Sequence, residues 1–117
     1  MAGPRWVRLD VDYFRNPKMQ TVGLRGRALH LAGVCYCAAQ LTDGHIPSTA
    51  VAGLLADAAV PRSTVEQLVA ANLWIQVGDG YLVHDFVAMN GTKADVLTRI
   101  EAAKKRKEKW RQNRQET

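Results

Sequence analysis

The amino-acid sequence predicts an α+β fold that is mainly α-helical. Apolar side chains recur every three or four residues over long stretches, which is the spacing of helices with one buried face. Two short strand-like runs flank Gly78-Asp79-Gly80, a composition typical of a hairpin turn. With 117 residues and 47% apolar content, the chain has the size of one folded domain with an extension.

The first expected elements are an extended segment and two helices. RWVRLDVDYF mixes apolar alternation with aromatic residues, which favours an extended segment or a short strand. In NPKMQTVG, Asn16 is a suitable helix cap, Pro17 fits the first helical position and Gly23 ends the helix. From Leu24 to Leu41 the apolar positions follow helical spacing, so a long, mostly buried and central helix is expected there.

A turn and a pair of short helices come next. TDGHIP combines a turn with an extended dipeptide, because Pro47 keeps Ile46 out of the helical region. Ser48 is placed to cap the helix TAVAGLLADA. Ser63 stands three residues before Glu66, which is the spacing of a capping box, and opens the second helix of the pair.

A hairpin follows the helix pair directly. Trp74–Val77 and Tyr81–Val83 are the two strand-like runs, and the segment at Ile46 can add a third strand. Two short helices joined by a turn and followed by a two-stranded hairpin form a winged helix-turn-helix, with the hairpin as the wing. A winged-helix domain is therefore expected over residues 1–91.

Charge separates the chain into two parts. Residues 1–91 hold seven basic and seven acidic side chains, whereas residues 92–117 hold nine basic and four acidic ones, which accounts for the net charge of +5. Thr92 is a suitable cap for a last helix. The apolar side chains of that helix fall on one stripe: Val96, Ile100, Ala103 and Trp110. The first half is therefore expected to dock on the domain and the basic second half to extend from it, as a separate unit over residues 92–117.

These pieces resemble the N-terminal winged-helix domain of bacteriophage replisome organiser proteins, a group related to bacterial replication-initiation proteins. The resemblance rests on WVRLDVDYFRNPKM, the long apolar helix, DGHIP, LVAANLWIQVGDGYLVHDF and the basic tail with its tryptophan, which together span most of the chain. It implies a phage or prophage protein that acts in DNA replication initiation or its regulation. Organiser proteins usually continue into a domain that recruits the helicase machinery, and because this chain stops at Thr117, helicase loading by this chain alone is not expected.

Two sets of side chains are candidates for DNA contact. Arg62, Thr64 and Gln67 open the second helix of the pair and are expected on its exposed face, towards a major groove. A structural or protein-facing role for that helix stays open, and the wing, with Asp79 and no basic residue, is not expected to bind DNA strongly. The second set lies in the basic tail: Lys104, Lys105, Arg106, Lys107, Lys109, Trp110, Arg111 and Arg114. The tryptophan can stack on Arg106, on Arg114 or on a base, and a merely solvated helix is the alternative.

No catalytic site, metal site or cofactor is predicted. The three histidines lie on different elements without the i, i+4 spacing of a helical metal site. Cys35 and Cys37 project roughly 200° apart around a helix, so they can neither share a metal nor form a disulfide. Asp10 and Asp12 would share one face of an extended segment, which hints at a metal-dependent nuclease, but exposed acids paired with nearby basic residues are the simpler interpretation. We expect a protein that is not an enzyme.

The expected partner is DNA in its double-stranded form. The sequence has neither a signal peptide nor a membrane span, so a cytoplasmic protein without a membrane partner is expected. A protein partner from the replication machinery and a homodimer stay open. The alternative function is a protein-interaction module that binds or inhibits a host or replication factor, with the tail serving only solubility.

Overall fold

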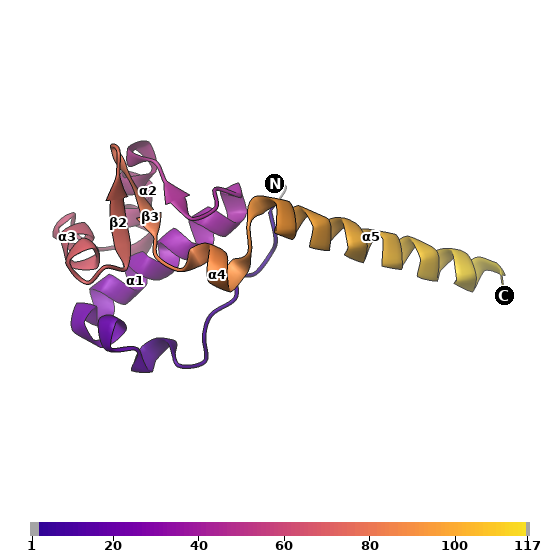
Figure 1. Ribbon diagram of the computed structural model, residues 1–117, viewed down its shortest axis with the longest axis horizontal. Coiled ribbons are helices and arrows are strands. Elements are labelled where there is room, and N and C mark those ends of the chain that lie inside the picture. Colours follow the sequence, from indigo (N-terminus) through magenta and orange to yellow (C-terminus); the bar gives the residue numbers. More distant parts are fainter. Residues whose placement is uncertain (1–2, 117) are drawn as a thin grey trace.

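The computed structural model describes residues 3–116; Met1, Ala2 and Thr117, which belong to the two predicted units, lie outside the described residues. The structure is mainly helical with a small three-stranded antiparallel sheet, as predicted. The elements in chain order are the 3-10 turn η1 (Tyr13–Arg15), α1 (Pro17–Gln40), β1 (His45–Ile46), α2 (Ser48–Ala58), α3 (Ser63–Ala70), β2 (Trp74–Val77), β3 (Gly80–Val83), α4 (Phe86–Asn90) and α5 (Lys93–Glu116). Residues 3–91 form a packed body, from which α5 projects (Figure 1).

Of the two expected forms of the opening segment, an extended segment or a short strand, the strand is not formed within the described residues. It runs irregularly to Asp10 and then turns into η1, with local hydrogen bonds such as that from the Tyr13 amide to the Asp10 carbonyl, 3.0 Å. Its alternating apolar side chains do not bury a common face: Val11 is 97% exposed and Trp6 is 74% exposed. Without a buried face or a neighbouring strand, alternation alone does not produce a β-strand.

The helix α1 contains the predicted break at a glycine. The side chain of Asn16 accepts a hydrogen bond from the Lys18 amide, 2.9 Å, and Pro17 is the first helical residue, as expected. Gly23 adopts φ +65° and ψ −166°, a conformation that side chains other than glycine rarely take, and the helix resumes after it. The second part lies at the centre of the body, where it packs against α2 and α3.

Both short helices begin one residue earlier than predicted, which makes the two expected serine caps wrong. Ser48 is the first helical residue of α2, after the extended Pro47, and its hydroxyl donates to the Asp79 carboxylate across 3.2 Å. Ser63 is likewise inside α3, because Arg62 already has helical dihedral angles, φ −59° and ψ −30°. A cap residue needs an extended backbone, so the capping box with Glu66 does not form.

The sheet has the strand order β1-β3-β2, with both pairs antiparallel. The hairpin turn lies at Gly78-Asp79, where Gly78 has φ +60°, and Ile46 pairs with Tyr81 as the predicted third strand. Trp74, which is fully buried, packs against the ring of Tyr81 with centroids 5.4 Å apart. The indole therefore joins the sheet to the helical core.

The helix α5 starts with the predicted Thr92 cap and then leaves the body. The Thr92 hydroxyl accepts from the Asp95 amide, 3.2 Å, and the Asp95 carboxylate accepts from the Thr92 amide, 3.1 Å, a reciprocal capping box. These hydrogen bonds from Thr92 lower the pKa of Asp95. Val96 is buried, but Ile100 is 37% exposed and Ala103 is exposed, so the expected docking of the whole first half is wrong. The helix axis points away from the body, and each further turn lies farther from it.

The projecting helix makes the molecule long. Its principal extents are 60 × 30 × 23 Å and its radius of gyration is 17.1 Å, whereas a compact chain of this length has about 13 Å. None of the helices in residues 3–116 combines the length and the apolarity that crossing a bilayer requires.

Candidate nucleic-acid interface

The helix α3 presents two of its three predicted contact residues. Arg62 and Gln67 are exposed, but Thr64 is only 1% exposed, so the expectation that it faces DNA is wrong. Thr64 lies one turn before the buried Leu68 and therefore on the inward face of the helix. Glu66 also lies on the exposed face, so this face carries no net charge.

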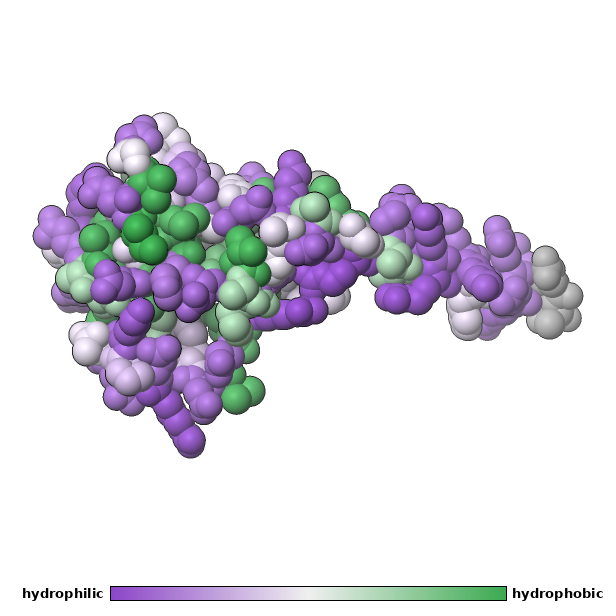
Figure 2. Space-filling view, viewed as in Figure 1, coloured by the Kyte–Doolittle hydropathy of each residue, from purple (hydrophilic) through white to green (hydrophobic). Residues whose placement is uncertain are grey.

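The predicted basic residues of the tail all lie exposed on one continuous helix. We call the stretch from Lys104 to Arg114 the arm; Figure 2 shows it as almost entirely hydrophilic on the visible side. Among the described residues, no acidic side chain forms an ion pair with the basic side chains of 104–111. Helical spacing places four of the basic residues along one side of the arm: Lys104, Lys107, Arg111 and Arg114.

Trp110 is 60% exposed on the arm, and the Arg114 guanidinium lies over its ring at 5.1 Å. Of the two arginines that the sequence left open as stacking partners, Arg114, one turn further along, is the one that lies over the ring. The cation–π contact holds the indole against the helix while one of its faces remains accessible.

The two predicted contact sets are not brought together. In Figure 1, α3 lies at one end of the body and the arm extends beyond the opposite end. Sequence-specific contacts by α3 and phosphate contacts by the arm would therefore be made at separate places on a nucleic acid.

A groove beside the base of the arm was missed by the sequence-based prediction. It has a volume of about 820 Å³ and lies between the N-terminal segment (residues 3–8) and the first turns of α5. Basic residues come from both sides, among them Arg5, Arg8 and Arg99, and Asp43 is the acidic residue in its lining. No local sequence pattern predicts this groove, because its two walls are about ninety residues apart in the sequence.

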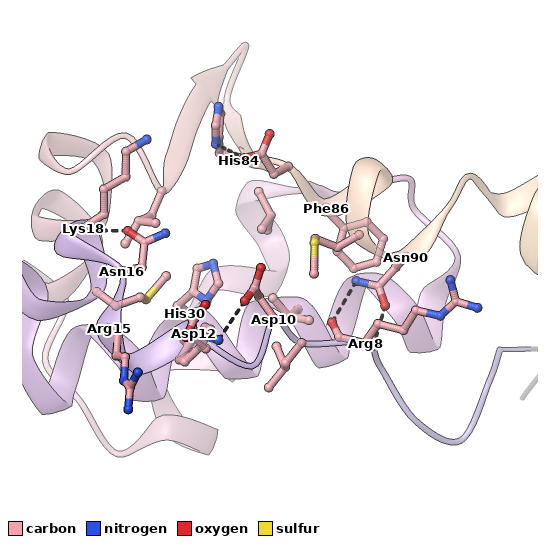
Figure 3. A pocket seen from close by; sticks show the side chains of 18 of the residues that line it. Arg8, Asp10, Asp12, Arg15, Asn16, Lys18, His30, His84, Phe86 and Asn90 are labelled. Carbon is pink, nitrogen blue, oxygen red and sulfur yellow. Dashed lines mark hydrogen bonds and ion pairs between the residues drawn. The ribbon is translucent and has the colours of Figure 1, made fainter.

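A second cavity, of about 460 Å³, lies between residues 8–12, α1 and α4 (Figure 3). Within it the Tyr13 hydroxyl and His30 Nδ1 are 2.9 Å apart. Burial lowers the pKa of His30 to about 4, and burial, opposed by the nearby Arg27 charge, raises the pKa of Tyr13 to about 12. At neutral pH the two groups therefore form an uncharged hydrogen bond, which suits a structural role better than acid–base chemistry.

The acids of this cavity do not form a metal site. The Asp10 carboxylate accepts a hydrogen bond from the Asp12 amide, 2.7 Å, so it closes a turn and the two acids do not share the face of an extended segment. The Asp85 carboxylate lies 3.1 Å from His84 Nδ1, at another side of the cavity. Within residues 3–116, no three His, Cys, Asp or Glu side chains are grouped so that they could hold a metal ion. Cys35 and Cys37 are both free thiols.

Comparisons with protein-family models, with curated proteins and with solved structures found no match to this chain.

Proposed function

We propose that this chain is a small DNA-binding protein whose basic arm supplies most of the affinity. The observation that carries the proposal is the arm itself: seven basic residues and one acid, Glu108, on a helix that projects into solvent. Packing the core requires none of these charges, and like charges at helical spacing repel one another. A polyanion with regularly spaced phosphates relieves this repulsion and releases its own counterions on binding.

The body supports a winged-helix interpretation. Its order of a long helix, a short strand, two short helices and a hairpin matches the plan inferred from the sequence. In that plan α3 is the recognition helix, and Arg62 and Gln67 are the side chains that reach base edges. The sequence resemblance to phage replisome organisers supports a role in replication initiation or its regulation. The chain then acts by binding, with modest sequence preference from α3, and catalyses no reaction.

The salt dependence of DNA affinity tests the role of the arm. Replacing Lys104, Lys105, Arg106 and Lys107 together by alanine should weaken duplex binding on the order of tenfold or more and flatten the salt slope by roughly one unit per lost contact. A matched pair of double variants sharpens the test: Lys105→Ala with Lys109→Ala on the arm, and Arg15→Ala with Arg25→Ala on exposed positions of the body. Equal losses in the two double variants, or an unchanged slope in the fourfold variant, would remove the basis of the proposal.

A second candidate, a protein-interaction module, is favoured by the hairpin. Ile75 is 40% exposed and Val77 is 47% exposed on the same face of β2, and Figure 2 shows hydrophobic side chains gathered over this region. An apolar face with Asp79 at its tip suits a protein surface better than a phosphate backbone. Under this alternative, DNA binding is weak and does not depend on the arm.

A further inference from the structure

One buried side chain, Asn90, joins the two walls of the groove at the base of the arm. Asn90 is 8% exposed, and its Oδ1 accepts from the backbone amide of Arg8, 2.7 Å, while its Nδ2 donates to the Arg8 carbonyl, 3.4 Å. Its own carbonyl accepts from the Arg99 guanidinium, 2.9 Å. Asn90 thus fixes the N-terminal segment and α5 at the same point, so both walls of the groove are positioned before any ligand binds.

The lining of the groove combines basic and apolar side chains. Arg5 and Arg8 come from the N-terminal segment, and Arg99, Lys104, Arg106 and Lys107 come from α5. The acid of the lining, Asp43, accepts a hydrogen bond from the Lys93 amide at the start of α5, so part of its charge is taken up by the helix terminus. Phe86 from α4 and Val96 and Ile100 from α5 add apolar surface to this lining. Basic and apolar side chains together suit a ligand with anionic edges and flat apolar faces.

Trp6 is the side chain that indicates which nucleic acid fits. It lines the groove, yet 74% of its surface is exposed, although the chain is fixed two residues further on, where Asn90 holds the Arg8 backbone. Exposed aromatic side chains beside a basic groove are the stacking platforms of proteins that bind single strands. A duplex keeps the faces of its bases covered by their neighbours, so it offers no free face to Trp6 within the helix.

We propose that the groove between residues 3–8 and the first turns of α5 binds single-stranded nucleic acid. Phosphates lie along the basic walls, and an unpaired base stacks on Trp6. The proposal rests on the proposed DNA-binding function and deepens it, because it adds a second, single-strand site to an arm that also contacts duplex phosphates. Such a protein holds a junction, with the duplex along the arm and the opened strand in the groove.

The test compares one labelled oligothymidine of about 15 nucleotides with a duplex of the same length, by fluorescence anisotropy on the full chain. Trp6→Ala should weaken binding of the single strand by about tenfold and leave duplex binding within about twofold. Trp6→Phe should restore most of the single-strand affinity, since phenylalanine keeps a stacking face. Phe14→Ala is the control, because it removes a 62% exposed aromatic side chain of the body that lies outside the groove, and it should leave single-strand binding unchanged. Arg8→Ala removes a basic side chain from the wall but keeps the hydrogen bonds to Asn90, because these use the Arg8 backbone. This variant should therefore lower the salt slope of single-strand binding.

The outcomes separate this site from the function on which it rests. Duplex binding through the arm, together with single-strand binding that is insensitive to Trp6→Ala, overturns the groove and leaves the DNA-binding function intact. Failure to bind either nucleic acid overturns both. Competition by polyglutamate as strong as that by oligothymidine of equal charge would show a site for acidic peptides and would also overturn the proposal.

Discussion

The body and the arm are stabilised in different ways. In the body, buried apolar side chains hold the elements together, and basic and acidic charges balance over residues 1–91. In α5 only Val96 is buried among the described apolar side chains. Hydrogen bonds join the first turns to the body, from the Lys93 amide to Asp43 and from Arg99 to the Asn90 carbonyl, and the exposed remainder depends on the hydrogen bonds of the helix itself. The 24 residues of α5 exceed the length at which an isolated helix is marginal in water, about 12 to 15 residues.

This difference separates the residues that build the structure from those available for a partner. The basic side chains of the arm are exposed, and under the proposed function they serve the binding of a polyanion. Substitutions in the body should therefore act on stability, and substitutions in the arm should act on affinity. Four predictions test that division, from the largest expected effect on stability to the smallest.

Trp74→Ala should have the largest effect. The indole is fully buried, contacts Tyr81 and leaves no room for a side chain at Gly33, where an added Cβ would lie 2.9 Å from the ring. Its removal should cost about 3 to 5 kcal/mol of unfolding free energy. Chemical denaturation followed by circular dichroism measures the loss. Ile75→Ala, on the exposed face of the same strand, is the control, and a similar loss there would contradict the assignment of the core.

Acid should weaken the body through His30. Its pKa is about 4 in the folded protein and 6.5 when exposed, so the unfolded chain takes up the proton first as the pH falls. The contribution of the neutral imidazole is complete above pH 6.5 and is lost between pH 6.5 and pH 4, about 3 kcal/mol in total. Unfolding free energies measured across this window should show the slope, and His30→Gln should remove it. A wild-type stability that stays flat down to pH 4 would show that His30 is not held neutral.

Local rules of the sequence predicted a large part of the fold. The break at Gly23, the hairpin around Gly78 and the Thr92 cap depend on the conformations of a few neighbouring residues, and all three are confirmed. The predicted caps at Ser48 and Ser63 are wrong by one residue, because the conformation of the preceding residue sets where each helix begins. The boundary of a helix is less strongly specified by sequence than its existence.

The candidate site was predicted less completely, for two physical reasons. The expectation that Thr64 is exposed is wrong, because its position one turn before Leu68 places it on the buried face of α3. Arg8 and Asn90 are hydrogen-bonded although they are 82 positions apart, and the spacing rules of helices and strands predict contacts only between near neighbours in the sequence. The basic groove therefore depends on the tertiary contact between the N-terminal segment and α5, which the sequence pattern does not predict. The basic arm needed no tertiary information, since charge and helical spacing are both read along the chain.

Val96→Asp should have an intermediate effect, because Val96 lies where the two regions meet. A carboxylate at this buried position loses its water and displaces apolar contact, which should cost roughly 2 kcal/mol. The matched variant Ile100→Asp, one turn further and 37% exposed, should cost less, since the carboxylate can remain hydrated. Thermal unfolding of the two variants compares them. A larger loss for Ile100→Asp would show that the docked part of α5 extends further than the structure indicates.

Ending the chain after Lys109 should have the smallest effect on stability and a clear effect on binding. The residues removed include Trp110, Arg111 and Arg114, which lie on the exposed end of the arm, and the contact between Trp110 and Arg114 is lost as a unit. The melting temperature should stay nearly unchanged, because exposed side chains away from the core contribute little to unfolding free energy. Duplex affinity should fall, and the salt slope should decrease by roughly two units, one for each lost basic contact.

Hydrogen exchange adds an independent measure: amides near Val96 should exchange slowly in both proteins, and those beyond Lys104 should be protected further when DNA is added. A lowered melting temperature together with unchanged DNA affinity would contradict the prediction. It would show that the end of the arm stabilises the fold and that another surface binds the partner.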